Sequence, residues 1–95
     1  MIDNIELYKK IIEIRGKDSQ CHQAMEECAE LTVALSHYVR KRPNSIEEII
    51  EELGDVEIMI QQLKVMFGKI FEAKVEENKI KKINNLLKEV ENTNG

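Results

Sequence analysis

The chain has 95 residues, no tryptophan, two Phe and two Tyr, so it can form one domain with a modest core built mainly from aliphatic side chains. Charged residues make up 34% of the sequence and Gly and Pro are scarce, a balance that favours helices over strands. The net charge of −4 argues against a general nucleic-acid-binding protein, because such a protein needs a basic surface.

The first predicted helix covers residues 4–14. Asp3, followed three residues later by Glu6, has the pattern of a capping box at the helix N-terminus. Gly16 is expected to end this helix, because glycine readily adopts the left-handed conformation found at helix C-termini.

The second predicted helix covers residues 20–41, with Asp18 or Ser19 as its N-cap. Apolar residues recur along it at three- and four-residue steps, which gives the helix one face for the core. Cys21 and Cys28 lie on this helix about 10 Å apart, too far for a disulfide, and are expected to be small core residues in a reducing compartment. The predicted apolar stripe consists of Ala24, Cys28, Leu31, Leu35 and Tyr38 or Val39.

The third predicted helix covers residues 46–67 and follows a break at Pro43 and Asn44. Ser45 with Glu48 forms the clearest capping-box pattern in the sequence. Apolar residues occupy most of the circumference of this helix, and such a helix is normally buried on nearly all sides. Because so short a chain has little other material to cover it, we expect self-association through this helix, most simply as a twofold dimer. A well-wrapped monomeric bundle is the alternative.

The fourth predicted helix follows Gly68 and covers residues 69–90, and residues 92–95 are expected to be a frayed tail. No segment has strand character. The expected fold is therefore all-α, an antiparallel bundle of about four helices per chain in a single domain over residues 1–91. The N-terminus lacks a signal-peptide pattern and no segment is apolar enough to span a bilayer, so a cytoplasmic location without a membrane partner is expected.

Two matched acidic steps, Glu27-Cys-Ala-Glu30 and Glu52-Leu-Gly-Asp55, stand on the second and third predicted helices. Within each step the two carboxylates are three residues apart, which places them one turn apart on the same side of a helix. If the two helices are antiparallel neighbours, four carboxylates converge. Converging carboxylates repel one another unless a cation lies between them, and Mg²⁺ is a usual occupant of such sites. The alternative is that helix rotation carries the four groups to solvent or to lysine partners.

The surroundings of the two steps resemble a known family. Glu26-Glu27-Cys-Ala-Glu30-Leu31 and Glu51-Glu52-Leu-Gly-Asp55-Val56 are similar to the E-E-x-x-E-L and E-E-L-G-D-V segments of the MazG-like, all-α NTP pyrophosphohydrolases. Asp18-Ser19-Gln20 is similar to the lead-in of many members. The resemblance covers about residues 18–63, roughly half of the chain.

This resemblance implies a helical homodimer or homotetramer that hydrolyses a nucleoside triphosphate between its α- and β-phosphates, giving the monophosphate and pyrophosphate. Mg²⁺ would be the cofactor, with Mn²⁺ as a substitute, and its ligands would be Glu27, Glu30, Glu52 and Asp55. Glu27 or Glu30 would also orient or deprotonate the attacking water.

Further residues are candidates for contact with the substrate. The resemblance implies a phosphate-binding cluster on the last helix, where Lys74, Asn78 and Lys82 follow one another at four-residue steps and so share a face, although many members carry Arg at the position of Lys82. Gln20 is a further candidate through its side-chain amide. His22 and His37 could lie near the substrate, but a lone histidine is more often a surface or packing residue.

Three other functions are alternatives. Phosphoribosyl-ATP pyrophosphohydrolase has the same reaction type, but the chain lacks that family's Lys-Lys-Val-Gly lead-in and its Ala-Asp-Leu segment. A di-iron bundle needs Glu-x-x-His steps, and neither histidine has a Glu three residues before it, since those positions hold Ser19 and Ala34. A non-enzymatic interaction module, in which the apolar third helix binds a partner protein, is the remaining alternative.

Overall fold

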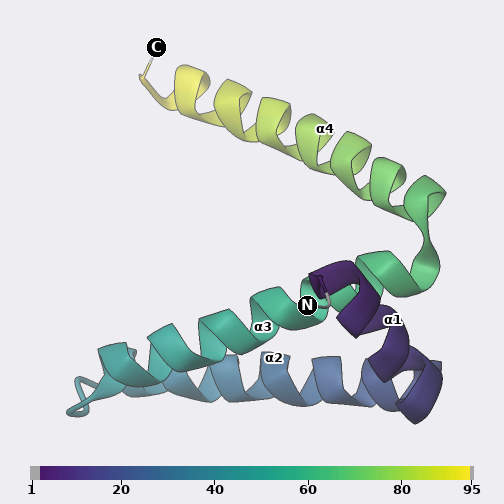
Figure 1. The fold of residues 1–95 in the computed structure, drawn as a ribbon. Helices are drawn as coiled ribbons and strands as arrows, with labels where there is room; N and C mark the ends of the chain where they lie inside the picture. Colours follow the sequence, from purple (N-terminus) through teal and green to yellow (C-terminus); the bar gives the residue numbers. More distant parts are fainter. Residues whose placement is uncertain (1–2, 95) are drawn as a thin grey trace.

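The computed structural model describes residues 3–94, and over that range the chain consists of four α-helices without any strand. This confirms the predicted all-α fold of about four helices. The helices are α1 (Asn4–Arg15), α2 (Lys17–Val39), α3 (Ser45–Phe67) and α4 (Lys69–Asn94), as Figure 1 shows. Within the described range no helix is long and apolar enough to cross a membrane.

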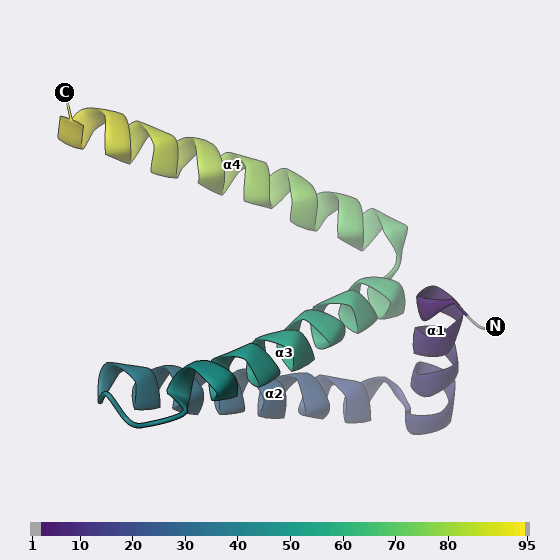
Figure 2. The ribbon, with the colours of Figure 1, turned by 60° about the vertical axis from the view of Figure 1, so that its left-hand side comes forward.

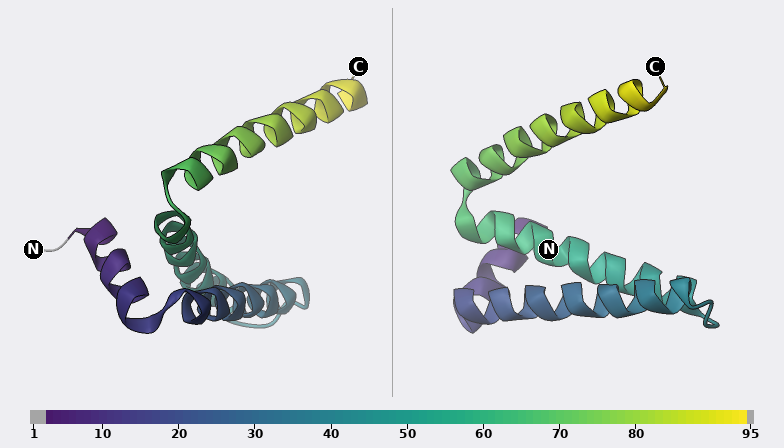
Figure 3. Two further views of the ribbon diagram at one scale, coloured as in Figure 1. Left: turned by 90° about the vertical axis from the view of Figure 1, so that its right-hand side faces the viewer. Right: turned by 180° about the vertical axis from the view of Figure 1, so that it is seen from behind.

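The centre of the molecule is the pair formed by α2 and α3, which lie side by side and antiparallel and are joined by a short loop over residues 40–44 (Figure 1). Helix α1 lies across the end of this pair where α2 begins and α3 ends, and it contacts both helices (Figure 2). Helix α4 contacts α3 alone among the described helices and then diverges from it as a long arm (Figure 3). The α2–α3 pair is therefore the frame on which a site can be built.

Two glycines divide the chain where it changes direction. Gly16 ends α1, as predicted, and Gly68 ends α3. Both have positive φ, 86° and 95°, but their ψ values of 156° and 177° are extended, so neither adopts the left-handed helical conformation expected for Gly16. Each glycine turns the chain by itself, so the next helix begins at the following residue. The predicted N-cap of the second helix at Asp18 or Ser19 is therefore wrong, because both residues already lie in the first turn of α2.

The two predicted capping boxes have different outcomes. At α1, the side chain of Asp3 accepts a hydrogen bond from the backbone N–H of Glu6 at 2.8 Å, which confirms Asp3 as the N-cap. At α3, the N-cap is Asn44 in the left-handed conformation, and no side chain caps the helix. The Ser45–Glu48 box is therefore wrong: Ser45 is buried, and the carboxylate of Glu48 instead contacts His37 across the helix pair.

The buried face of α2 is rotated from the predicted stripe. Ala24 is buried as expected, but Cys28 and Leu35 are exposed, and Gln20 and Ala34 are buried in their place. Facing them, α3 buries Val56, Met59, Gln62 and Met66. Both cysteines are free, with Cys21 half-buried, so the core position predicted for Cys28 is wrong in the single chain. Small residues on α2 bring the two helices into contact along this face.

The single chain is open and has a small core. Its surface of 7746 Å² exceeds the roughly 5,600 Å² expected for a compact chain of 11.0 kDa. Its radius of gyration of 17.0 Å exceeds the roughly 12 Å expected for a compact domain of this length. Helix α4 continues to Asn94, so residues 92–94 are helical where a frayed tail was predicted, while Gly95 lies outside the described residues. Apolar faces of α3 and α4 remain exposed within one chain.

Candidate metal centre

The antiparallel pairing of α2 and α3 brings the two acidic steps together. The step on α2 and the step on α3 meet halfway along the pair, where carboxylates from both helices face one another. We call Glu27, Glu30, Glu52 and Asp55 the acid cluster. Three of its members, Glu27, Glu52 and Asp55, each place a carboxylate oxygen within 4.8 Å of the other two, and all three are half-buried. Glu30 is not part of this close triad.

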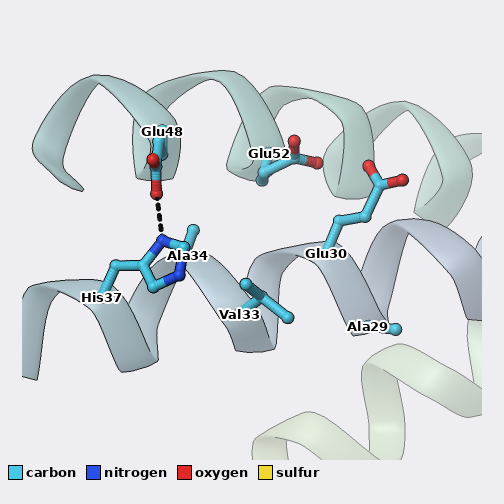
Figure 4. A pocket seen from close by; sticks show the side chains of 7 residues that line it. All are labelled: Ala29, Glu30, Val33, Ala34, His37, Glu48 and Glu52. Carbon is cyan, nitrogen blue, oxygen red and sulfur yellow. Dashed lines mark hydrogen bonds and ion pairs between the residues drawn. The ribbon is translucent and has the colours of Figure 1, made fainter. Parts of the chain in front are cut away.

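Glu30 lies at the exposed edge of the cluster. Its side chain and that of Glu52 extend from facing helices with their carboxyl groups turned toward each other, as Figure 4 shows. The two groups are close enough to interact, because Glu30 contributes to the raised pKa of Glu52 both by a hydrogen bond and by its charge. All four predicted carboxylates are therefore brought to one place, with Glu30 the most accessible of them.

The pKa of Glu27 is raised above its ordinary value. Burial is the main cause, because the half-buried side chain loses hydration in its charged form. The negative charges of Glu30 and Asp55 raise the pKa further. A hydrogen bond from Gln23 has the opposite effect on the pKa. The side-chain Nε2 of Gln23 donates to Glu27 Oε1 at 2.8 Å, which stabilises the carboxylate and lowers the pKa.

The pKa of Glu52 is raised to about 7. Burial is again the main cause, followed by the hydrogen bond and the charge of Glu30, and then by the charges of Asp55 and Glu27. Near neutral pH, therefore, Glu52 of the metal-free cluster stays partly protonated, whereas an isolated glutamate is ionised. The cluster contains more negative charge than its own residues can stabilise.

Two oxygen atoms of the cluster lack any hydrogen-bond partner. Glu27 Oε2 and Glu52 Oε2 are inaccessible to solvent, and no described residue donates to either of them. Buried polar atoms in folded proteins are normally paired, so each unpaired oxygen requires an explanation. A divalent cation bound here would account for both, since hard cations prefer carboxylate oxygens as ligands and the charge of the cation would offset the repulsion. The residues present therefore suit a metal ion.

Two polar contacts near the cluster were missed in the sequence. Gln23 donates to Glu27 from one turn earlier on α2, and a four-residue Gln–Glu spacing could have indicated this pair. His37 on α2 lies 2.7 Å from Glu48 on α3, measured between Nδ1 and Oε2. The capping-box pattern predicts a role for Glu48 at the start of its own helix, and no local pattern indicates that the side chain crosses to the other helix.

The predicted substrate-binding residues lie apart from the cluster in the single chain. Lys74, Asn78 and Lys82 are exposed on α4, which does not contact α2, and none of the hydrogen bonds or ion pairs among residues 3–94 joins them to the acid cluster. Gln20 lies seven residues before Glu27 on the buried face of α2 and is only 2% exposed. A substrate contact by any of these four residues stays a prediction.

The chain matches no family model, no curated protein and no solved structure.

Proposed function

We propose that the protein is a Mg²⁺-dependent nucleoside triphosphate pyrophosphohydrolase, the activity implied by the resemblance of its two acidic steps to the MazG-like family. The observation that carries the proposal is the convergence of Glu27, Glu52 and Asp55 within 4.8 Å, with two buried oxygen atoms lacking partners. A triphosphate is itself strongly anionic, so an acidic site can accept it only with cations between the two.

In this proposal the four carboxylates of the acid cluster bind the metal, and a neighbouring residue orients one of them. Glu27, Glu52 and Asp55 hold the metal with Glu30, and Gln23 fixes the carboxylate of Glu27 so that its second oxygen stays turned inward. A bound Mg²⁺ supplies charge neutralisation at the phosphate oxygens and lowers the pKa of a bound water. Mn²⁺ takes the same oxygen ligands and is expected to substitute.

The reaction is a hydrolysis in which water attacks the α-phosphorus. The new bond joins the water oxygen to that phosphorus, the bond to the bridging oxygen breaks, and pyrophosphate leaves. The water loses a proton to a carboxylate, and Glu27 and Glu30 are the candidates for this base. Glu30 is the exposed member of the cluster and so the one that solvent water reaches most directly, whereas Glu27 is half-buried and has a raised pKa.

A direct assay tests the proposal. Purified protein is mixed with a panel of NTPs and dNTPs in Mg²⁺, Mn²⁺ or EDTA, and pyrophosphate and monophosphate are measured. The expected result is release of both products in equal amounts with either cation and none in EDTA. A folded protein that releases no pyrophosphate from any nucleotide contradicts the proposal and favours a non-enzymatic interaction module.

We also infer that the active form is a homo-oligomer in which α3 packs against α3 of a second copy. One exposed flank of α3 carries an apolar line with alternating three- and four-residue steps, interrupted by Glu57 and by Lys64, which is half-buried and pairs with Glu76 of α4. This spacing is that of a coiled-coil seam. The line consists of Ile46, Ile50, Leu53, Ile60 and Phe67, each exposed in the single chain.

Association of two chains would also change which residues lie near the acid cluster, including the predicted phosphate-binding residues of α4. In one chain the acid cluster has no lysine or arginine among its hydrogen-bond or ion-pair partners in the described range, and α4 holds its lysines away from it. A second copy can place α4 near the cluster without any change within either chain. We propose that Lys74, Asn78 and Lys82 approach the substrate only in the assembled protein.

A further inference from the structure

A groove between α2 and α3 extends from the acid cluster toward the loop that joins the two helices. It forms a pocket of about 430 Å³, within the range of small-molecule sites. Glu30 and Glu52 line one end, and the wall beyond them is apolar, formed by small α2 side chains that include Val33 and Ala34 (Figure 4). The pocket therefore joins the proposed metal centre to an apolar surface.

The other end of the pocket carries a bonded pair of polar side chains, His37 and Glu48. Nδ1 of His37 lies 2.7 Å from Oε2 of Glu48, a short distance typical of a charge-assisted hydrogen bond. Both side chains are partly buried, with 25% of His37 and 44% of Glu48 exposed. The contact fixes Glu48 through one oxygen, and Oε1 is left as an acceptor without a partner among the described residues.

The spacing of the two ends limits what can occupy the pocket. His37 lies seven residues beyond Glu30 on α2, a rise of about 10 Å, and Glu48 lies four residues before Glu52 on α3, a rise of about 6 Å. A ligand that spans this distance needs phosphates at the metal centre, a flat apolar body along the wall, and hydrogen-bond donors at the far end. A nucleotide whose base carries an exocyclic amino group has all three.

We propose that Glu48 selects nucleotides whose base carries an exocyclic amino group, and that His37 is the positioning residue that holds its carboxylate. This rests on the proposed function, since it assigns the base end of the same site. The amino group of cytosine, adenine or guanine donates to Oε1 of Glu48. A carbonyl oxygen at the same place, as in uracil or thymine, brings two acceptors together and is repelled.

Paired substrates that differ at this one group test the proposal. Values of kcat/KM are measured for CTP against UTP and for GTP against ITP, because each pair differs in an amino group. We expect the wild type to prefer the amino-bearing member by about 10- to 100-fold, the range for one hydrogen bond to a charged group. Glu48→Gln should reduce that preference to within about threefold, because the amide of Gln both donates and accepts.

Two further variants test the positioning role of His37. His37→Ala should reduce the preference as Glu48→Gln does, whereas His37→Asn, which keeps a side-chain donor, should restore part of it. A merely structural role would lower the rates of both members of a pair alike and leave their ratio unchanged. Glu47→Gln is the matched control, since Glu47 is the exposed neighbour of Glu48 on α3, and it should leave the ratio unchanged.

The outcomes separate this proposal from the proposed function. Pyrophosphate release with the same base preference in the wild type and in Glu48→Gln overturns the role of Glu48 and leaves the activity standing. If no nucleotide is hydrolysed, calorimetry with CMP and UMP decides: binding of CMP that Glu48→Gln weakens supports the subsite, and absent or equal binding overturns it. A change in molecular mass on Glu48→Gln would show that the pocket is a contact between chains, which also overturns the proposal.

Discussion

At the scale of single residues, the acid cluster combines burial with unneutralised charge. Glu27 and Glu52 each have a raised pKa and an unpaired buried oxygen, and Asp55 lies within reach of both. Groups arranged in this way destabilise the metal-free fold, and a cation would offset their repulsion. In the proposed function, stability without metal and activity therefore oppose each other at these positions. Variants that remove one charge should separate the two effects.

Asp55→Asn should abolish Mg²⁺-dependent turnover and raise the melting temperature of the protein in EDTA, because it removes one of the repelling charges. The wild type should gain stability when Mg²⁺ is added, by about 2.7 kcal/mol at a concentration 100 times the Kd, and the variant should gain little. Thermal unfolding with and without Mg²⁺ measures both effects. Glu47→Gln serves as the control, and near-normal activity in Asp55→Asn would show that Asp55 is not a ligand.

The raised pKa of Glu52 predicts a specific dependence of stability on pH. Because the folded chain holds this proton more tightly than the unfolded chain, the stabilisation is fully present below the ordinary pKa near 4.5 and is lost as pH rises through about 7. In EDTA, wild type and Glu52→Gln should therefore have similar stabilities near pH 4.5. Above pH 7 the variant should be the more stable of the two, which urea unfolding across this pH range can measure. A constant difference at every pH would contradict the coupling of Glu52 to its acidic neighbours.

At the scale of helices, the sequence predicted the presence of the four helices and the meeting of the two acidic steps. It predicted less well where each helix begins and which face of it is buried. The existence of four helices and the meeting of the acidic steps depend on regular spacing, which is visible in the sequence. The start of α3 depends instead on a contact with another helix. Ser45 and Glu48 have the pattern of a capping box, but the carboxylate of Glu48 contacts His37 on α2. The buried face of α2 differs from the predicted one because the close approach of α3 buries small residues such as Ala34, whereas the larger Leu35 stays exposed.

Gly68 and Gly54 form a matched pair for testing why α3 ends where it does. Gly68 has φ 95° and ψ 177°, a region occupied almost only by glycine, so Gly68→Ala should cost about 1–3 kcal/mol although no atom lies near the added methyl group. Gly54 lies inside α3, also with free space, so Gly54→Ala should stabilise the chain by about 1 kcal/mol. Chemical denaturation of both variants measures the two effects. Destabilisation by Gly54→Ala would instead reveal a second chain packed closely against α3 at this position.

At the scale of the whole molecule, one chain covers too little of its own apolar surface. Its buried apolar residues are few and include two alanines, Ala24 and Ala34, while large side chains along α3 and α4 stay exposed. Among residues 3–94, the long α4 arm contacts α3 alone, near the end of that helix. A core of this size supplies little stability, so much of the folding free energy should come from contacts between copies.

The stability of the protein should therefore depend on its concentration. If folding and association are linked, the melting temperature rises as the protein concentration increases over a 100-fold range, and light scattering gives at least twice the chain mass. Ile50→Lys places a charge in the middle of the exposed line on α3 and should lower both the mass and the melting temperature. Ile14→Lys changes an exposed isoleucine on α1, outside that line, and should alter neither. A melting temperature that is independent of concentration, with the mass of one chain, would show that the open helix pair is stable alone and that α3 does not pair.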